Sequence, residues 1–299
     1  MRRREFVATT AGATLALSGL PPLLRNARDP EPAGPIRFGY AAITWQGNDL
    51  QAIDDIAALG FRGIQLRASA AERWGANPQE LRDLLGARAL TFVALSSGLV
   101  RLDPAVEAED LALHLRNARF VRDAGGLYLQ VVDQRPTGRV PTPDDFRRMG
   151  RLLTELGRRT ADLGVPLGYH NHMGNLGQSA DEVARVLDAA DPRFLKLELD
   201  IAHYGQAGGD PAEAVRRYAE RLLFLHIKDV ESPVPGGAPN SYRFVELGRG
   251  KVDLRAVFAM LGQVRFKGWA IVELDRSDTP KESGGISRRY LTETLGLEV

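Results

Sequence analysis

The chain of 299 residues contains no cysteine. This absence excludes disulfides, thiolate nucleophiles and cysteine-ligated zinc, so histidine, aspartate and glutamate are the strong metal ligands that remain. Net charge is also nearly absent, because 39 Lys and Arg residues face 38 Asp and Glu residues. Without an overall positive field, a nucleic-acid-binding or membrane-surface protein is not indicated. The 44% hydrophobic and 26% charged residues are typical of a soluble globular protein.

The N-terminus has the layout of an export signal. Residues 2–4 are all arginine, Phe6 and Val7 follow, and a mildly apolar run extends over residues 8–24. The arginine pair before Phe6 and Val7 resembles the twin-arginine signal. The run is too weakly apolar for a transmembrane helix, so no stable membrane insertion is expected. We predict a cleavable twin-arginine-type signal peptide over 1–29 and periplasmic localisation; a retained amphipathic helix is the alternative.

The rest of the chain is predicted to be one domain, covering residues 36–299. Residues 30–35, with their prolines and glycine, are predicted to be a linker. Removal of residues 1–29 takes away five positive and two negative charges, which changes the net charge from +1 to −2. The mature domain is therefore still less suited to nucleic acid.

Short apolar segments alternate with segments of helical periodicity from residue 36 onward. The eight predicted strands cover residues 36–43, 63–66, 90–95, 126–132, 166–171, 194–200, 222–228 and 269–274. The predicted helices cover 49–59, 78–85, 104–124, 143–163, 180–190, 211–221, 254–261 and 286–295. Such alternation predicts a parallel sheet covered by helices, and eight units predict a single (β/α)8 TIM barrel. A doubly wound open sheet is the rival, but no Gly-x-Gly-x-x-Gly follows an early strand.

Four of the five histidines lie where predicted strands end. His170 and His172 end one strand, His203 follows the next, and His226 ends the one after that. Asp200 ends the strand that His203 follows, and Glu273 lies near the end of the last strand, so four consecutive strands contribute. Because the carboxyl ends of barrel strands form one rim, these side chains are predicted to converge. Two imidazoles and two carboxylates suit a divalent ion such as Mn²⁺, Co²⁺, Zn²⁺ or Mg²⁺. The fifth histidine, His114, is predicted to be structural.

Structural roles compete with some of these assignments. No helix is predicted to start between residues 200 and 210, which argues against a helix-capping role for Asp200. Glu198 shares a strand face with Asp200 and is predicted to point into the barrel. Burying this carboxylate unpaired is costly, so it needs either the site itself or a lysine partner. Alternative ion pairs are open at these positions, namely Glu198 with Lys196 or Lys228, Glu273 with Arg276 or Lys267, and Lys228 with Asp229. The Pro- and Gly-rich residues 232–240 predict a long active-site loop.

Several spaced motifs carry a family resemblance. They are Tyr169–Gly174 (YHNHMG), Asp200–His203 (DIAH), His226–Asp229 (HIKD), Leu247–Asp253 (LGRGKVD), Gly268–Glu273 (GWAIVE) and, near the start, Ile43–Trp45 (ITW) and Gly60–Ile64 (GFRGI). As a set they resemble the xylose isomerase-like TIM barrels of the sugar phosphate isomerase/epimerase class, with the inosose dehydratase branch closest. The resemblance covers nearly all of residues 36–296.

The resemblance implies a divalent metal at the barrel mouth and proton removal next to a carbonyl. Asp200, His226 and Glu273 match three metal-ligand positions of the family. The fourth position falls at His170, where the epimerases often carry glutamate. The ligand glutamates of those epimerases also act as the two bases. The histidine at this position therefore argues against symmetric epimerisation by two carboxylate bases. Another position at which the family usually carries glutamate is occupied by Gln65 in this chain. Mn²⁺ or Co²⁺ is favoured as the ion, with Zn²⁺ and Mg²⁺ as alternatives.

The same residues suggest catalytic roles. Neutral imidazole accepts a proton near pH 7, so His172 is predicted to be the base, with Glu273 as the second. Lys228 or His203 is predicted to bind or protonate a substrate oxygen. Reprotonation at carbon gives isomerisation or epimerisation, which we take as the first prediction. Loss of a β-substituent gives a lyase that eliminates water or an aglycone, which is the alternative. Export predicts an unphosphorylated keto-sugar, keto-glycoside or cyclitol ketone as substrate.

Two other classes of function remain open. A non-catalytic periplasmic sugar-binding protein needs no metal but keeps aromatic side chains at the rim; Trp45, Trp74, Tyr204 and Tyr242 are the candidates. Of these four, Trp45 is predicted to bind substrate. His203 and Glu198 are also predicted to bind substrate. Cleavage of abasic DNA, which related barrels perform, requires a basic face and more ligands than the chain contains.

Overall fold

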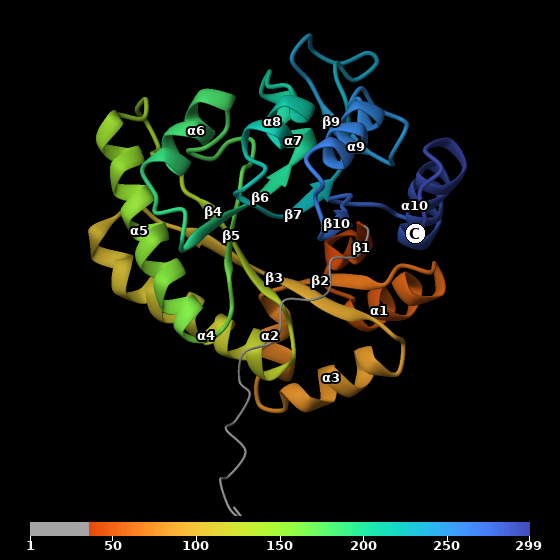
Figure 1. Cartoon of the computed structure of the whole chain (residues 1–299), viewed down its shortest axis with the longest axis horizontal. Helices are drawn as coiled ribbons and strands as arrows, with labels where there is room; N and C mark the ends of the chain where they lie inside the picture. The colour runs from red at the N-terminus through yellow and green to blue at the C-terminus, as the bar shows by residue number, and fades with distance from the viewer. Residues whose placement is uncertain (1–35) are drawn as a thin grey trace, which may run out of the picture. The chain divides into compact units, whose positions relative to one another are not determined.

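The computed structural model describes residues 36–299; the predicted signal peptide and linker lie outside the described residues. Eight parallel strands close into a barrel in the order β1-β10-β7-β6-β5-β4-β3-β2, in which β1 pairs with both β2 and β10 (Figure 1). The strands are β1 (Arg37–Ala41), β2 (Gly63–Arg67), β3 (Thr91–Val100), β4 (Tyr128–Asp133), β5 (Leu167–His170), β6 (Leu195–Asp200), β7 (Leu222–Ile227) and β10 (Trp269–Val272). The prediction of a closed barrel is confirmed, and the open sheet is wrong.

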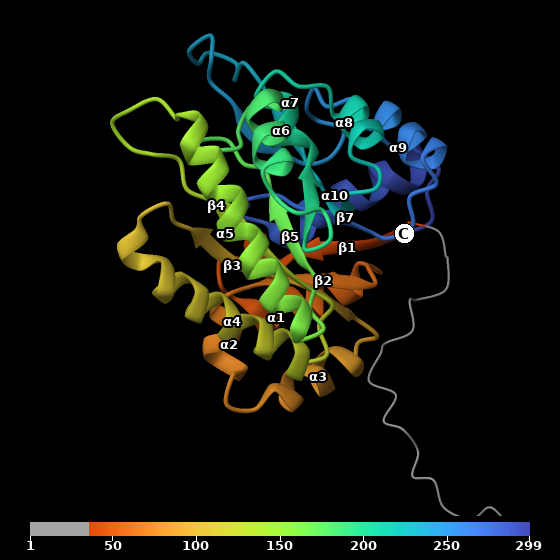
Figure 2. The ribbon, with the colours of Figure 1, turned by 60° about the vertical axis from the view of Figure 1, so that its left-hand side comes forward.

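Helices surround the strands on the outside of the barrel (Figures 1 and 2). They are α1 (Asp49–Ala58), α2 (Ser69–Trp74), α3 (Pro78–Gly86), α4 (Glu107–Asp123), α5 (Pro143–Asp162), α6 (Ala180–Asp188), α7 (Ile201–Gln206), α8 (Pro211–Arg217), α9 (Leu254–Gln263) and α10 (Pro280–Arg289), with 3-10 turns at Ala42–Trp45 and Pro104–Val106 and a π-helical turn at Tyr290–Thr294. Within residues 36–299, no helix is both long and apolar enough to cross a membrane.

The barrel interior is filled by side chains. Ala41, Val93, Phe224, Trp269 and Ile271 form a buried cluster inside the strands, separate from the larger core between strands and helices. Gly63 is glycine because Trp269 packs against it: a Cβ at this position would lie 2.4 Å from the ring atom Cζ3. A packed interior leaves the carboxyl ends of the strands as the place for a site.

Local signals set several helix starts as the sequence predicts. In α5, Thr142 and Asp145 form a capping box and Pro143 occupies the first turn; in α6, Ser179 and Glu182 form a second capping box. These side chains satisfy backbone N–H groups that have no partner within the helix. They therefore fix where each helix begins after its strand.

Three helices differ from the prediction. The last helix begins at Pro280 and not at residue 286; the prediction started it too late because Gly284 and Gly285 lie inside it. Gly284 packs closely against the end of α1, where an added Cβ would lie 2.7 Å from Leu59 Cδ1. The six-residue helices α2 and α7 were not predicted at all, since each is too short to show apolar periodicity. Asp200 caps α7, so the argument against a capping role for Asp200 was wrong.

A two-stranded antiparallel hairpin stands beside the predicted long loop. Its strands are β8 (Asp229–Glu231) and β9 (Arg243–Val245), and residues 232–242 connect them. In Figure 2 this connection extends beyond the strands at the top of the barrel. The hairpin thus adds a chain segment to the rim formed by the carboxyl ends of the strands.

Candidate active site

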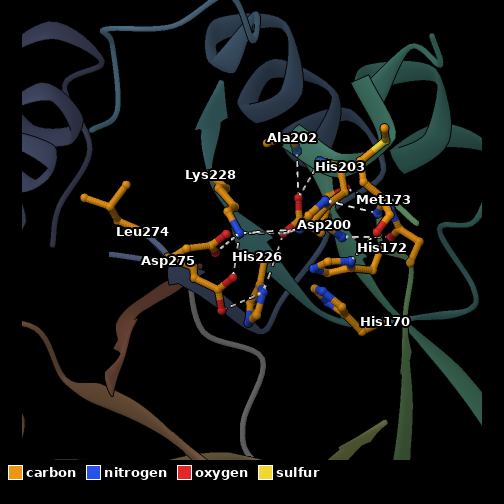
Figure 3. Close-up of polar contacts among 12 residues, drawn as sticks. His170, His172, Met173, Asp200, Ala202, His203, His226, Lys228, Leu274 and Asp275 are labelled. Carbon is orange, nitrogen blue, oxygen red and sulfur yellow. Dashed lines mark hydrogen bonds and ion pairs between the residues drawn. The ribbon is translucent and has the colours of Figure 1, made fainter. Parts of the chain in front are cut away.

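The predicted histidines and carboxylates meet at the carboxyl ends of β5, β6, β7 and β10. The His170 ring centroid lies 4.8 Å from that of His226 and 5.9 Å from that of His203, and the His172 and His203 centroids are 3.8 Å apart. Figure 3 shows these rings gathered around Asp200. His172 is half-buried, whereas the other three histidines are buried. The predicted convergence at one rim is confirmed, and His172 is the imidazole most open to a substrate.

Asp200 has two separate functions at the end of β6. Its Oδ1 accepts hydrogen bonds from Ala202 N at 2.9 Å and His203 N at 2.8 Å, which caps α7. Its Oδ2 faces the site, 3.7 Å from His226 Nδ1 and 4.0 Å from Lys228 Nζ. The cap therefore fixes the carboxylate with one oxygen turned toward the other site residues.

His226 is oriented from inside the barrel. Its Nε2 lies 2.6 Å from Glu198 Oε1 and 2.6 Å from Gln65 Oε1. Its Nδ1 faces Asp200 and lies 3.3 Å from Glu273 Oε2. Because Nε2 faces two acceptors, one ring proton lies there, and Nδ1 is the nitrogen turned toward the site. Burial by itself lowers the pKa of His226, but the charges of Glu198 and Glu273 raise it well above its usual value, so a cation that binds at Nδ1 would displace a proton from it.

Glu198 serves the site itself and has neither proposed lysine as its partner. The side chain is fully buried, and its close contacts are His226 and, at 3.7 Å, His170 Nδ1. The structure thus corrects the prediction that Glu198 binds substrate. A carboxylate that accepts the second N–H of an imidazole is the usual partner of a metal-binding histidine.

The site residues fit a divalent cation. Ligand atoms of His170, Asp200 and His226 lie within 4.8 Å of one another. Within residues 36–299, His170 Nδ1, Asp200 Oδ2 and His226 Nδ1 are buried without a hydrogen-bond partner, which is costly unless another group satisfies them. Burial and the neighbouring His226 hold the pKa of His170 well below its usual value, so its lone pair is available. Glu273 Oε2 faces the same space and completes the four predicted ligands.

We expect Glu198→Gln to weaken Mn²⁺ binding by about 10-fold to 100-fold, because the charge that orients and polarises His226 is lost. Titration calorimetry on protein stripped of metal measures this change. Glu155→Gln is the control, since it removes the same charge from an ion pair on the exposed face of α5. Equal affinities in the wild type and the Glu198 variant would show that His226 needs no such partner.

Lys228 is a buried ammonium among carboxylates. Its Nζ donates to Asp275 Oδ1 (Figure 3) and to Glu273 Oε1 at 2.8 Å. It also lies 3.9 Å from the centroid of the Phe244 ring. Burial by itself lowers the pKa of Lys228, but Glu273, Asp200 and Asp275 together raise it above its ordinary value. Lys228 therefore stays charged and is a hydrogen-bond donor at the rim.

The other ion pairs considered from the sequence do not form. Glu273 pairs with Lys228 instead of Arg276 or Lys267. Asp229 does not pair with Lys228 either; its carboxylate accepts the backbone N–H groups of Gly248, Gly250 and Val252. The LGRGKVD motif is thus a loop that Asp229 fastens to the end of β7.

The Met173 peptide group orients two imidazoles. Its carbonyl oxygen lies 2.6 Å from His172 Nδ1, and its N–H donates to His203 Nδ1 at 3.2 Å. A carbonyl only accepts, so His172 carries its proton on Nδ1 and keeps a lone pair on Nε2. An amide only donates, so the Met173 N–H needs a lone pair on His203 Nδ1, while His203 Nε2 lies 3.4 Å from the Lys228 ammonium. Burial and the charge of Lys228 lower the pKa of His203, which favours a neutral ring. The Met173 peptide group thus leaves His172 Nε2 as an acceptor and fixes the His203 ring beside it.

Two residues of the site were not predicted. Phe244 of β9 covers Lys228 and lies 4.7 Å from the His203 ring. No sequence pattern places residue 244 at the rim, because the hairpin pairing does so. Asp275 was detectable, since it lies two residues after Glu273, and strand residues at that spacing share a face.

The predicted aromatic rim is mostly absent. Trp45 packs edge-on against Tyr40 in the core between strands and helices, and its Nε1 donates to Asp55 Oδ2 at 2.9 Å. These contacts correct the prediction that its ring faces a substrate. Trp74 and Tyr204 are buried, whereas Tyr242 is 39% exposed and packs against Phe244. His114 is structural as predicted, bonded to Ser97 and Leu99.

Comparison with known proteins agrees with this geometry. Residues 53–293 match the family described as xylose isomerase-like TIM barrel. An inosose dehydratase of Lacticaseibacillus casei is 26% identical, over 88% of this chain and 98% of that protein. An inosose dehydratase of Geobacillus kaustophilus is also 26% identical, over 81% of this chain and 88% of that protein.

Solved structures show the same fold. A probable 3-DHS dehydratase of Bacillus anthracis superposes with a TM-score of 0.73 at 16% identity, covering 86% of this chain and 99% of that chain. The IOLI protein, whose crystal structure has a bound zinc atom, superposes with a TM-score of 0.72 at 17% identity, covering 87% of this chain and 98% of that chain. The named relatives include carbohydrate-acting enzymes, some of them carbon–oxygen lyases. With most of its length matched by the family, the chain belongs to the xylose isomerase-like TIM barrels.

Proposed function

We propose that this protein is a divalent-metal-dependent carbon–oxygen lyase that dehydrates an unphosphorylated keto-sugar or cyclitol ketone. The observation that carries the proposal is the asymmetry of its acid and base groups. His172 offers a free nitrogen lone pair, while Lys228 holds Glu273 at 2.8 Å. Epimerisation by two bases needs a second free base on the opposite face, which this arrangement does not offer. The order of the two reaction classes drawn from the sequence is therefore reversed.

The proposed ligands of the cation are His170, Asp200, His226 through Nδ1, and Glu273. Imidazole with carboxylate suits Mn²⁺ or Co²⁺, with Zn²⁺ and Mg²⁺ as alternatives. When bound, a divalent ion supplies positive charge beside the substrate oxygen that becomes negative as the proton leaves. The relatives named as dehydratases and the zinc in the IOLI structure support this assignment.

The protein's own side chains then move the protons. His172 Nε2 accepts the proton from the carbon next to the carbonyl, as that C–H bond breaks. The C–O bond at the neighbouring carbon breaks as a carbon–carbon double bond forms. The departing hydroxide takes a proton from His203 Nε2 or Lys228 Nζ and leaves as water. The substrate loses one water and is neither oxidised nor reduced.

The substrate class rests on the predicted export signal. Phosphorylated sugars are scarce outside the cytoplasm, so we propose that the protein acts in the periplasm on an unphosphorylated ketone. Inosose is the first compound to test, because curated relatives are named inosose dehydratases.

The test is incubation of the metal-stripped and Mn²⁺-loaded protein with inosose, keto-sugars and 3-keto-glycosides in D₂O, followed by mass spectrometry and NMR. We expect metal-dependent loss of water. Metal-dependent deuterium uptake without loss of mass would instead indicate an isomerase or epimerase. Saturable sugar binding by the stripped protein without turnover would indicate a binding protein.

A further inference from the structure

Asp133 is a buried carboxylate that the mechanism above does not use. It is the last residue of β4 and has no exposed surface. One of its oxygens accepts from Tyr169 Oη at 2.7 Å and from Gly177 N at 2.9 Å; the other accepts from Leu176 N at 2.9 Å. These partners belong to β5 and to the loop that follows it, so Asp133 joins that loop to two neighbouring strands.

The loop fits this carboxylate closely. A Cβ at Gly177 would lie 1.8 Å from Tyr169 Oη, so only glycine lets this amide reach Asp133. Arg135, two residues after Asp133, donates to the carbonyl of Asn175 at 2.9 Å. The segment 175–177 is therefore held by its amides and by a carbonyl, which determines the direction of its peptide groups.

The same loop carries the Met173 peptide group. A hydrogen bond from Asn175 N to His172 O, at 3.2 Å, closes a turn over residues 172–175. The segment fixed by Asp133 thus continues directly into the peptide that orients His172 and His203. A rotation of this turn breaks both contacts of Met173, and with them the orientation of the two rings.

We infer that Asp133 is a positioning residue, which holds the 171–178 loop in the arrangement that keeps His172 Nε2 free to accept a proton and the His203 ring fixed beside it. The catalytic consequence rests on the proposed function. The orientation of the two rings does not rest on the proposed function, because the rings are oriented in the absence of substrate.

The test compares Asp133→Ala and Tyr169→Phe with the wild type. Nitrogen-15 NMR of the histidines in the metal-free protein is expected to show the His172 proton on Nδ1. In Asp133→Ala this assignment should be lost to averaging. The value of kcat for dehydration should fall about 10-fold to 100-fold, with a smaller change in KM, as expected for a misplaced catalytic group. Tyr169→Phe removes one of the three bonds and should give a smaller change of the same kind.

Asp110→Asn is the matched control. This buried carboxylate accepts from Arg101 N and Nε after β3, and it fastens a loop that carries none of the site residues. It should lower thermal stability without changing the NMR signals of His172 and His203 or kcat, whereas the signal of His114, which the Asp110 charge influences, is expected to shift. A folded Asp133→Ala with wild-type imidazole signals would overturn the inference. If that variant does not fold, unchanged signals in Tyr169→Phe overturn it equally. A wild type without turnover refutes the proposed reaction alone, since the NMR result is independent of it.

Discussion

Asp200→Asn is expected to abolish divalent-metal binding and activity while the barrel stays folded. Asparagine keeps an Oδ1 that caps α7 through Ala202 and His203, and it is as good a capping residue as aspartate. The second oxygen becomes an amide nitrogen, which is no ligand and places a donor beside His226. Because the charge supplied by a metal stabilises the transition state by several kcal/mol, we expect kcat/KM to fall by about 10³-fold or more. Metal content by mass spectrometry and a circular-dichroism melting curve measure the two halves of this prediction.

Asp210→Asn provides the control for this variant. Asp210 caps α8 in the same way, through Ala212 N at 2.9 Å and Glu213 N at 3.2 Å, but it is exposed and has no contact with the histidines. It should retain full metal content and activity. Full metal occupancy in the Asp200 variant would show that the metal site has been placed wrongly.

His172→Gln is expected to lose catalysis and to keep the metal. Removal of a general base lowers the rate by about 10²-fold to 10⁴-fold, and glutamine cannot take up the substrate proton. His170→Gln should instead lose the metal, because His170 is the proposed ligand. Metal content together with the rate of deuterium exchange into substrate separates the two effects.

Loss of the metal in His172→Gln would have a definite structural meaning. Ligand atoms of His170, His172 and His203 also lie within 4.8 Å of one another. If His172→Gln loses metal as completely as His170→Gln does, the cation is held by these three imidazoles and His172 is not the base.

The barrel could be predicted because its signals are local. Strand and helix periodicity repeat eight times, and capping residues such as Thr142 and Ser179 mark helix starts within a few residues of where they act. The errors lie where packing overrides local preference. Gly284 and Gly285 suggest a helix break, yet they lie inside α10 because α1 packs closely there.

The convergence of the site could be predicted for a related reason. Parallel strands end at one rim, so residues at strand ends meet even when 26 to 56 positions separate them in the sequence, as in the contacts among His170, Asp200, His226 and Glu273. Trp45 was misplaced because it follows β1 in a 3-10 turn that directs its ring into the core between strands and helices. Phe244 was missed because an antiparallel hairpin brings it to the rim.

The sequence by itself determined the barrel, the rim where the chemistry lies, and the imidazole and carboxylate groups available there, because these follow from periodicity and strand ends. Only the tertiary structure decided what each group does. Glu198 orients His226, Lys228 holds Glu273, and one peptide group orients two neighbouring histidines. Such roles depend on which atoms of distant segments lie within hydrogen-bonding distance, and no spacing along the chain specifies that.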